Sequence, residues 1–187
     1  VDRTRSDARG ASRALPRRPK PLPLNDLEKT AASLNARYRH YSAPSVLAHA
    51  LRDPDAGELA LVSSFGAESV VLLHMVSVAR RDTPVIFLDT ELLFAETLVY
   101  QQEVSERLGL TDVRVIHADR AEVARIDPDQ TLNQRDTDAC CALRKTFPLQ
   151  TALAGFDGWV TGRKRFQSGT RASLPFFEVE TPSNAPA

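Results

Sequence analysis

The feature that most constrains the fold is a regular alternation of short apolar runs with longer helical ones. Apolar residues recur at helical spacing over Glu68–Arg81, Phe94–Leu108 and Ala142–Ala154. Four short strand-like runs alternate with these stretches: Leu59–Val62, Val85–Leu88, Val113–Ile116 and Trp159–Thr161. Because parallel strands need a crossover helix between them, this order predicts right-handed βαβ units. The predicted fold is therefore α/β, a Rossmann-like parallel sheet with helices on both faces.

The two ends of the chain differ in composition from the part between them. Residues 1–23 hold seven basic residues, two acidic residues and four prolines, so we expect a disordered arm there. An Arg-rich, acid-poor start is also typical of an organelle transit peptide, and that alternative stays open. The folded domain is expected over residues 24–180, with leading helices at 27–41 and 44–52. Residues 181–187 are expected to form a disordered tail.

Composition excludes several classes of protein. No apolar run approaches the roughly 20 residues that a membrane span needs, and the 42% hydrophobic and 26% charged shares are typical of a soluble domain. Nucleic-acid binding is not expected, because the basic arm lacks aromatic residues for base stacking and the rest of the chain is acidic. Two cysteines exclude a disulfide scaffold and favour a reducing compartment. We therefore expect a cytoplasmic protein without a membrane partner.

Polar residues follow the first two predicted strands, at the ends where parallel sheets bind ligands. The segment Ser63-Ser-Phe-Gly-Ala-Glu-Ser69 combines hydroxyl groups and a glycine with the start of a helix. Hydroxyl and backbone donors at such a place can hold phosphate, although a plain N-cap is the commoner reason for the serines. The segment is neither a Walker loop nor a Gly-x-Gly-x-x-Gly fingerprint. Asp89 is expected either to bind a ribose hydroxyl or to cap a turn.

Basic residues gather after the fourth predicted strand. Gly162 is followed by four cations between Arg163 and Arg171, in a domain that is otherwise acidic. Arginine holds phosphate or sulfate through paired N–H groups, so an anion-binding loop is the favoured interpretation. A solvated basic loop is the alternative, because runs of charge usually face water.

The two cysteines of the chain, Cys140 and Cys141, are adjacent. Neighbouring residues make a poor disulfide, because the ring that they would close is small and strained. Beside Arg144 and Lys145, two thiolates fit better as soft metal ligands in an electropositive pocket. An iron–sulfur cluster usually takes four cysteines, so the pair predicts half of a ligand set.

Taken together, these segments resemble the adenylyl-sulfate (APS) and phosphoadenylyl-sulfate (PAPS) reductases of assimilatory sulfate reduction. Those enzymes have the adenine nucleotide α-hydrolase-like (PP-loop) fold. The resemblance covers nearly all of residues 25–180, which would form an APS-reductase-like nucleotide-binding domain. The matching segments are Ser63–His74, Phe87–Thr90 with Leu93–Leu98, Cys140–Lys145 with Pro148-Leu149, and Gly162–Gln167 with Gly169-Thr-Arg171. A related PP-loop enzyme that adenylates or transfers sulfur is less favoured, because Ser-Phe-Gly replaces the Ser-Gly-Gly usual there.

The resemblance implies a role for each matched position. The implied substrate-binding residues are Ser63, Ser64, Phe65, Gly66, Ser69, Leu88, Asp89, Lys145, Gly162, Arg163 and Arg171. Among them, the serines and Gly66 would form a modified phosphate loop, and Phe65 and Leu88 would line the adenosine pocket. Lys145 and Arg171 would hold the phosphosulfate. Cys140 and Cys141 would be two of the four ligands of a [4Fe-4S] cluster, in a branch of the family that generally prefers APS.

The implied reaction converts APS or PAPS to sulfite and AMP or PAP. A cysteine thiolate attacks the sulfate sulfur, the nucleotide leaves, and thioredoxin or glutathione then frees sulfite. This chain lacks the family's second cysteine pair and its near-terminal catalytic cysteine, so no catalytic residue is assigned within it. We expect a fragment of the reductase that is inactive by itself, with homo-oligomers plausible from the family. The alternative is a non-catalytic adenine-nucleotide-binding module.

One residue departs from the resemblance inside the expected site. Glu91 stands where the family usually has a glycine after Leu-Asp-Thr. A carboxylate that pointed into the site would weaken the binding of an anionic substrate through like-charge repulsion.

Overall fold

The structure is a computed structural model that describes residues 23–162 and 174–180. At its centre is a four-stranded parallel sheet in the order β3-β2-β1-β4. The strands are β1 (Leu59–Val62), β2 (Val85–Leu88), β3 (Val113–Ile116) and β4 (Gly158–Val160). At the middle of the sheet, Leu61 of β1 pairs with Val85 of β2 on one side and with Val160 of β4 on the other. The α/β fold with a parallel sheet is thereby confirmed.

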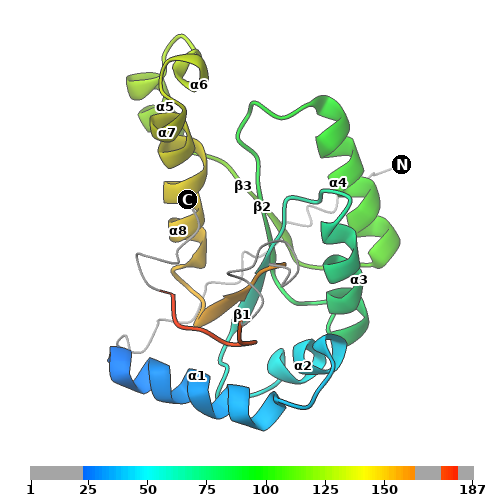
Figure 1. Ribbon diagram of the computed structural model, residues 1–187. Helices are drawn as coiled ribbons and strands as arrows, with labels where there is room; N and C mark the ends of the chain where they lie inside the picture. Colours follow the sequence, from blue (N-terminus) through cyan, green and yellow to red (C-terminus); the bar gives the residue numbers. More distant parts are fainter. Residues whose placement is uncertain (1–22, 163–173, 181–187) are drawn as a thin grey trace, which may run out of the picture.

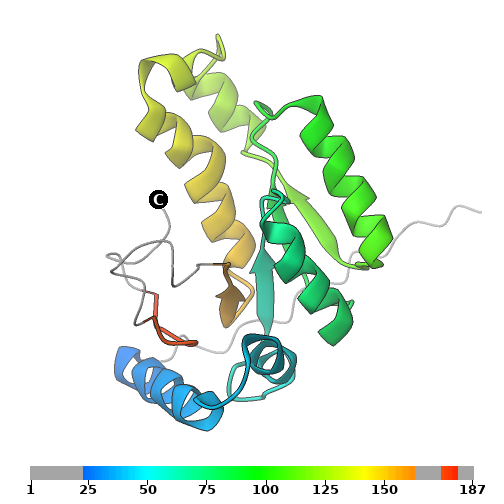
Figure 2. The ribbon, with the colours of Figure 1, turned by 45° about the vertical axis from the view of Figure 1, so that its right-hand side comes forward.

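Two helices, α3 (Ser69–Ala79) and α4 (Ala95–Leu108), cover one face of the sheet. The chain steps from β1 to β2 to β3 in one direction, so right-handed crossovers place both connecting helices on the same side. The main core lies beneath them. Its buried members on these strands and helices, and on the loop between β1 and α3, are Leu61, Phe65, Leu73, Val76, Val85, Phe87 and Val104. Figure 2 shows the two helices side by side on one face of the sheet.

The opposite face is covered by a run of helical segments between β3 and β4. They are α5 (Arg120–Ile126), α6 (Leu132–Arg135), α7 (Thr137–Cys141), the π-helix η1 (Ala142–Thr146) and α8 (Phe147–Leu153). Because β4 lies on the far side of β1, this crossover reverses direction and its helix packs on the other face. Leu149 and Leu153 of α8 contact the cluster of Ala60 and Ile86.

The helices α1 (Leu24–Tyr38) and α2 (Ala43–Ala50) precede β1 and lie at the end of the sheet where β1 begins (Figure 1). Tyr38 and Val46 form a small second core with Phe177, which belongs to the described segment 174–180. The Asn35 side chain of α1 holds this segment by accepting hydrogen bonds from Phe176 N and Phe177 N, each at 3.0 Å. The last described residues thus pack against the first helix.

Most predicted elements occur at or near their predicted positions. The strands β1, β2 and β3 have the predicted bounds, and Gly109 ends α4 in the left-handed conformation, with φ of +64°. The leading helices begin and end a few residues earlier than expected, and the run predicted as one helix over Ala142–Ala154 starts as a π-helix. In the described part of the chain, no helix is long and apolar enough to span a bilayer. Except for Pro23, the expected arm and tail lie outside the described residues and stay predictions.

Candidate functional site

The candidate site is the edge of the sheet at which the strands end. After β3 the chain returns past β2 and β1 to form β4, so the helix that follows β1 and the helices that lead into β4 lie on opposite faces of the sheet. Such a reversal is a topological switch point, where open α/β sheets bind their ligands. Ser63 follows β1 directly, Asp89 follows β2, and Gly162 lies two residues after β4. The fold thus brings three of the predicted segments to one edge.

The loop between β1 and α3 is anchored through its buried residues. Ser63 is buried, and its Oγ accepts a hydrogen bond from Phe65 N at 3.1 Å. Phe65 has φ of +55°, and its ring, 1% exposed, packs edge-on against Phe87 with centroids 5.5 Å apart. The intervening Ser64 and the following Gly66 remain exposed. The Phe65 ring lies in the core, and the adenosine contact expected of this residue stays a prediction.

The first turn of α3 follows this loop. Ser69 N donates to the Gly66 carbonyl at 2.8 Å, and no side-chain hydrogen bond caps the first turn in the described structure. The N–H groups of an uncapped first turn, together with the helix dipole, favour an anion there. A Cβ at Gly66 would meet Ser64 Oγ at 3.6 Å, an ordinary contact. Folding therefore does not require a glycine at this position. A ligand that approached the backbone closely would require one, because a side chain would stand in its way.

A tight turn follows β2. Asp89 is buried and its Oδ1 accepts a hydrogen bond from Glu91 N at 2.8 Å, which is the turn cap considered from the sequence. Its other oxygen lies 3.7 Å from Nδ1 of His117, at the end of β3. Glu91 has φ of +60°, a left-handed conformation that glycine adopts without strain. Leu88, the last residue of β2, is partly exposed beside this turn.

The two cysteines lie on one nearly continuous helix and have different surroundings. Cys140, at 7% exposure, packs with Leu132 and Leu143, whereas Cys141 is half-buried. Both are free thiols. The π-helix η1 begins directly after Cys141, and such segments occur often at functional sites. Lys145 lies on η1 and is exposed.

The residue next to Lys145 does not provide the cationic pocket that the sequence suggested. Arg144 is 3% exposed, and its Nη2 donates to Asp127 Oδ2 at 2.9 Å. Its Nη1 donates to the Thr90 carbonyl at 3.0 Å and lies 3.6 Å from Glu91 Oε2. The hydrogen bond from the guanidinium holds the pKa of Asp127 below its ordinary value. Arg144 therefore ties η1 to the turn after β2 and has little charge left for a ligand.

Sequence reasoning missed the pairing of Arg144 with Asp127. The sequence did contain one indication, the spacing of Arg144, which lies midway between Cys140 and Pro148. All three residues are buried. An arginine among buried helix positions needs a carboxylate partner. Arg144 Nε has no hydrogen-bond partner among the described residues.

The residues present do not make a complete iron–sulfur site. The chain has two cysteines, and a [4Fe-4S] cluster takes four. Among the described residues, no group of three or more His, Cys, Asp or Glu side chains could hold a metal ion. Cys140 and Cys141 therefore offer at most part of a ligand set, and no chemical step is assigned to a cluster on this chain.

Other predicted site residues lie at the end of the described chain or outside it. Gly162 is exposed after β4, and a Cβ on it would contact Leu72 Cδ2 of α3 at 3.6 Å. Arg163 and Arg171 lie outside the described residues, so their predicted contact with an anion stays a prediction. The described site thus provides hydroxyl groups, an uncapped helix start and Asp89, while Lys145 is exposed on η1.

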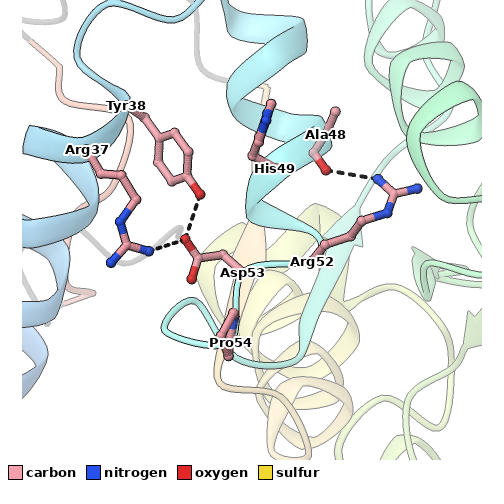
Figure 3. A pocket seen from close by; sticks show the side chains of 7 residues that line it. All are labelled: Arg37, Tyr38, Ala48, His49, Arg52, Asp53 and Pro54. Carbon is pink, nitrogen blue, oxygen red and sulfur yellow. Dashed lines mark hydrogen bonds and ion pairs between the residues drawn. The ribbon is translucent and has the colours of Figure 1, made fainter.

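A hollow of about 470 Å³ lies elsewhere, between α1, α2 and the segment that leads into β1 (Figure 3). It is lined by Arg37, Tyr38, Ala48, His49, Arg52, Asp53 and Pro54. Asp53 Oδ2 accepts hydrogen bonds from Arg37 Nη1 at 2.5 Å and from Tyr38 Oη at 2.6 Å. Because these polar groups satisfy one another at the opposite end of β1, the hollow is a structural feature of the helical layer.

Comparison with known proteins agrees with this geometry. Residues 58–185 match the phosphoadenosine phosphosulfate reductase domain family. A protein of Mesorhizobium japonicum named adenosine 5′-phosphosulfate reductase is 46% identical over 167 residues, which cover 86% of this chain and 66% of that protein. A Chelativorans protein of the same name is 43% identical over 164 residues, with 87% and 66% covered. The chain thus spans just under two thirds of the length of these curated relatives.

A solved structure shares the fold. The crystal structure of phosphoadenylyl-sulfate reductase from Candida auris, in a phosphate complex, superposes with a TM-score of 0.61 at 25% identity, covering 80% of this chain and 72% of that one. The fold and the strand-end site define an α/β protein of the adenine nucleotide α-hydrolase-like class. Within that class, the chain belongs to the APS/PAPS reductase family.

Proposed function

We propose that this chain is the nucleotide-binding core of an enzyme that reduces APS, or PAPS, to sulfite in sulfate assimilation. One observation carries the proposal. The serine loop, the uncapped start of α3, Asp89 and Gly162 meet at one switch point within the domain that matches the reductase family. The names of the relatives supply the substrate class, and the Candida auris reductase was crystallised as a phosphate complex.

In this proposal the phosphate-binding groups come from the β1–α3 loop. Ser64 and Gly66 are exposed there, and Ser69 opens the first turn of α3, so hydroxyl and backbone N–H groups can donate to phosphate oxygens. Ser63 holds the loop in shape through its hydrogen bond with Phe65 N. The loop therefore orients the nucleotide and involves no proton transfer.

The remaining roles follow the order of the strands. Leu88 would border the adenosine, together with the backbone of Phe65, whose ring is buried in the core. Asp89 would accept a hydrogen bond from a ribose hydroxyl with the oxygen that faces His117. Gly162 would let the nucleotide approach the end of β4. Lys145, Arg163 and Arg171 would hold the phosphosulfate and offset charge on the leaving phosphate.

The proposed reaction is a thiol-dependent reduction. A cysteine thiolate forms a bond to the sulfate sulfur, while the bond from sulfur to the phosphate oxygen breaks and AMP (or PAP) leaves with the electron pair. The product is an enzyme thiosulfonate. Two electrons from thioredoxin or glutathione then release sulfite, and the thiols are oxidised to a disulfide. We assign the nucleophile to neither Cys140 nor Cys141, so it would come from a part of the whole protein that this sequence does not contain.

The cofactor and the cellular setting are proposals of the same kind. Cys140 and Cys141 would supply two ligands of a [4Fe-4S] cluster, and the whole protein would supply the other two. Two free thiols fit a reducing cytoplasm, and homo-oligomers are plausible for the whole protein.

A second candidate is an adenine-nucleotide-binding module without redox activity. It is favoured by the two-cysteine count, because the chain holds neither a full cluster ligand set nor an assigned nucleophile. Both candidates predict nucleotide binding, and they differ in whether the whole protein produces sulfite.

Titration calorimetry with AMP tests the nucleotide site. We expect the chain to bind AMP and Ser64→Ala to weaken binding about tenfold, because a hydrogen bond to a charged phosphate is lost. Ser33→Ala, which removes an exposed hydroxyl from α1, is the matched control and should leave the affinity unchanged. A wild-type chain that does not bind AMP would contradict the proposal.

A sulfite assay with APS and thioredoxin separates the binding core from the complete enzyme. We expect no sulfite from this chain alone and no strong absorbance at roughly 400 nm, where thiolate–iron charge transfer falls. Sulfite release by the chain would overturn the placement of the nucleophile outside this sequence.

A further inference from the structure

The backbone at Glu91 is unusual for a charged residue. Its φ of +60° is a left-handed conformation that costs a residue with a side chain roughly 1–2 kcal/mol. The turn fixes this conformation, because Asp89 Oδ1 accepts a hydrogen bond from Glu91 N at 2.8 Å. Backbone geometry does not favour a glutamate here, and the side chain, 39% exposed, is held by an ion pair with Arg144. An unfavourable residue at the edge of a binding site points to a role for its carboxylate.

The carboxylate is also held in place. Glu91 Oε2 lies 3.6 Å from Arg144 Nη1, and Arg144 is fixed by Asp127 and by the Thr90 carbonyl. Arg144 therefore lies between two carboxylates. Asp127 also has Arg135 Nη2 at 4.0 Å from its Oδ1, whereas Glu91 shares its cation, Arg144, with Asp127. Asp89, in the same turn, adds a second carboxylate to this end of β2.

These charges oppose the ligand that the site is proposed to bind. A nucleotide phosphate carries between one and two negative charges at neutral pH. At distances of several ångströms near a protein surface, a fixed carboxylate repels such a charge appreciably. The repulsion grows with the charge of the ligand, so it penalises a nucleotide with two phosphate groups more than one with a single group.

We propose that Glu91 is a specificity-determining residue that sorts nucleotides by their negative charge. Its carboxylate, held by Arg144 at the carboxyl end of β2, favours a sulfate nucleotide with free ribose hydroxyls over one with a further phosphate. This inference rests on the proposed function, because it concerns the same nucleotide site. It assigns the choice between APS and PAPS in part to a residue outside the cysteine pair and the basic loop.

Three stable ligands of rising charge test the inference by calorimetry: adenosine, AMP and adenosine 3′,5′-bisphosphate. Glu91→Gln keeps the size of the side chain and removes its charge. We expect the variant to leave the adenosine affinity unchanged, to tighten AMP about fivefold and to tighten the bisphosphate about 25-fold. The gain should shrink when salt is raised, because the interaction is electrostatic.

Two further variants separate charge from other causes. Glu103→Gln makes the same change on the exposed face of α4 and should alter none of the three affinities. Glu91→Gly removes the charge and relaxes the backbone, and it should match Glu91→Gln if charge is the cause. Equal changes for all three ligands, or no change for the bisphosphate, would overturn the inference. A wild-type chain that binds none of the ligands would instead overturn the proposed function.

Discussion

The buried pair of Arg144 and Asp127 is the residue-scale feature on which the site depends. Asp127 accepts hydrogen bonds from Arg144 Nη2 and from Leu132 N, each at 2.9 Å. We predict that Asp127→Ala lowers the melting temperature by about 10 °C, because it leaves a buried guanidinium short of a partner. Thermal unfolding followed by circular dichroism measures this. Asp129→Ala, two residues along and exposed, should shift it by no more than about 2 °C, and equal shifts for both variants would contradict the prediction.

The structural role of a residue could be predicted from the sequence where only neighbouring residues determine it. Asp89 caps a turn because an Asp side chain reaches the backbone N–H two residues on, and Gly109 ends α4 because it tolerates a positive φ. The partner of Arg144 was not readable, because Asp127 lies 17 residues away and only the packing of η1 on the end of β2 joins them. For that reason we expected Arg144 to give the cysteines an electropositive pocket, whereas the structure shows it paired with Asp127.

At the scale of elements, Asn35 joins the first described helix to the last described segment. Its Oδ1 accepts from Phe176 N and Phe177 N, and its Nδ2 donates to the Phe177 carbonyl at 2.6 Å. We predict that Asn35→Ala lowers the free energy of unfolding by about 2 kcal/mol, because two partly buried hydrogen bonds and one exposed hydrogen bond to this segment are lost. Urea denaturation measures the change.

A local probe shows whether the segment itself is released. Trp159, the single tryptophan of the chain, donates from Nε1 to Glu180 Oε2 at 3.0 Å. In Asn35→Ala we expect the Trp159 emission to shift to longer wavelength as segment 174–180 leaves α1 and β4. Asn133→Ala, on the exposed side of α6, is the control and should not change it. A destabilised variant with unchanged emission would show that Asn35 acts only within α1.

Elements were predictable where their apolar period was strong. The strands β1 and β2 are short apolar runs covered by helices, whereas β3 is partly exposed, and the bounds of all three follow from the apolar pattern. The short helices α5 and α6 lie in a polar stretch and were missed, although Asp119 caps α5 by accepting from Ala121 N and Glu122 N. The π-helix η1 could not be foreseen, since the sequence period does not mark which turn carries the extra residue.

At the scale of the whole molecule, the order of the strands creates the switch point at which the candidate site lies. The alternation predicted a parallel sheet but not that β4 would lie beside β1. That placement depends on the long polar crossover through α5 and α7, which carries the chain to the opposite face. The same crossover brings the cysteine helix to the end of β2, so that motifs more than 50 residues apart in sequence meet at one edge.

Carboxylates in two different layers make the stability of the whole domain depend on pH. The pKa of Asp53 is lowered chiefly by the hydrogen bond from Tyr38, and the pKa of Asp127 is lowered chiefly by the bond from Arg144. A carboxyl whose pKa is lower in the folded state stabilises the fold above its unfolded pKa, and this contribution is lost as the pH falls through the folded value. The ordinary value is 3.8, so the loss should begin just above pH 4 and continue below it.

At alkaline pH, the free energy of unfolding should depend on Tyr38 and not on these carboxylates. Burial raises the pKa of Tyr38 above its ordinary value of 10, so its contribution is complete below pH 10 and is lost only above that. We therefore predict a plateau of unfolding free energy between about pH 5 and 9, with a steep fall on acidification, measured by urea denaturation at each pH. Asp53→Asn should lower the plateau and flatten the acid fall, because the amide does not titrate. An unchanged acid slope in that variant would show that Asp53 does not drive acid unfolding.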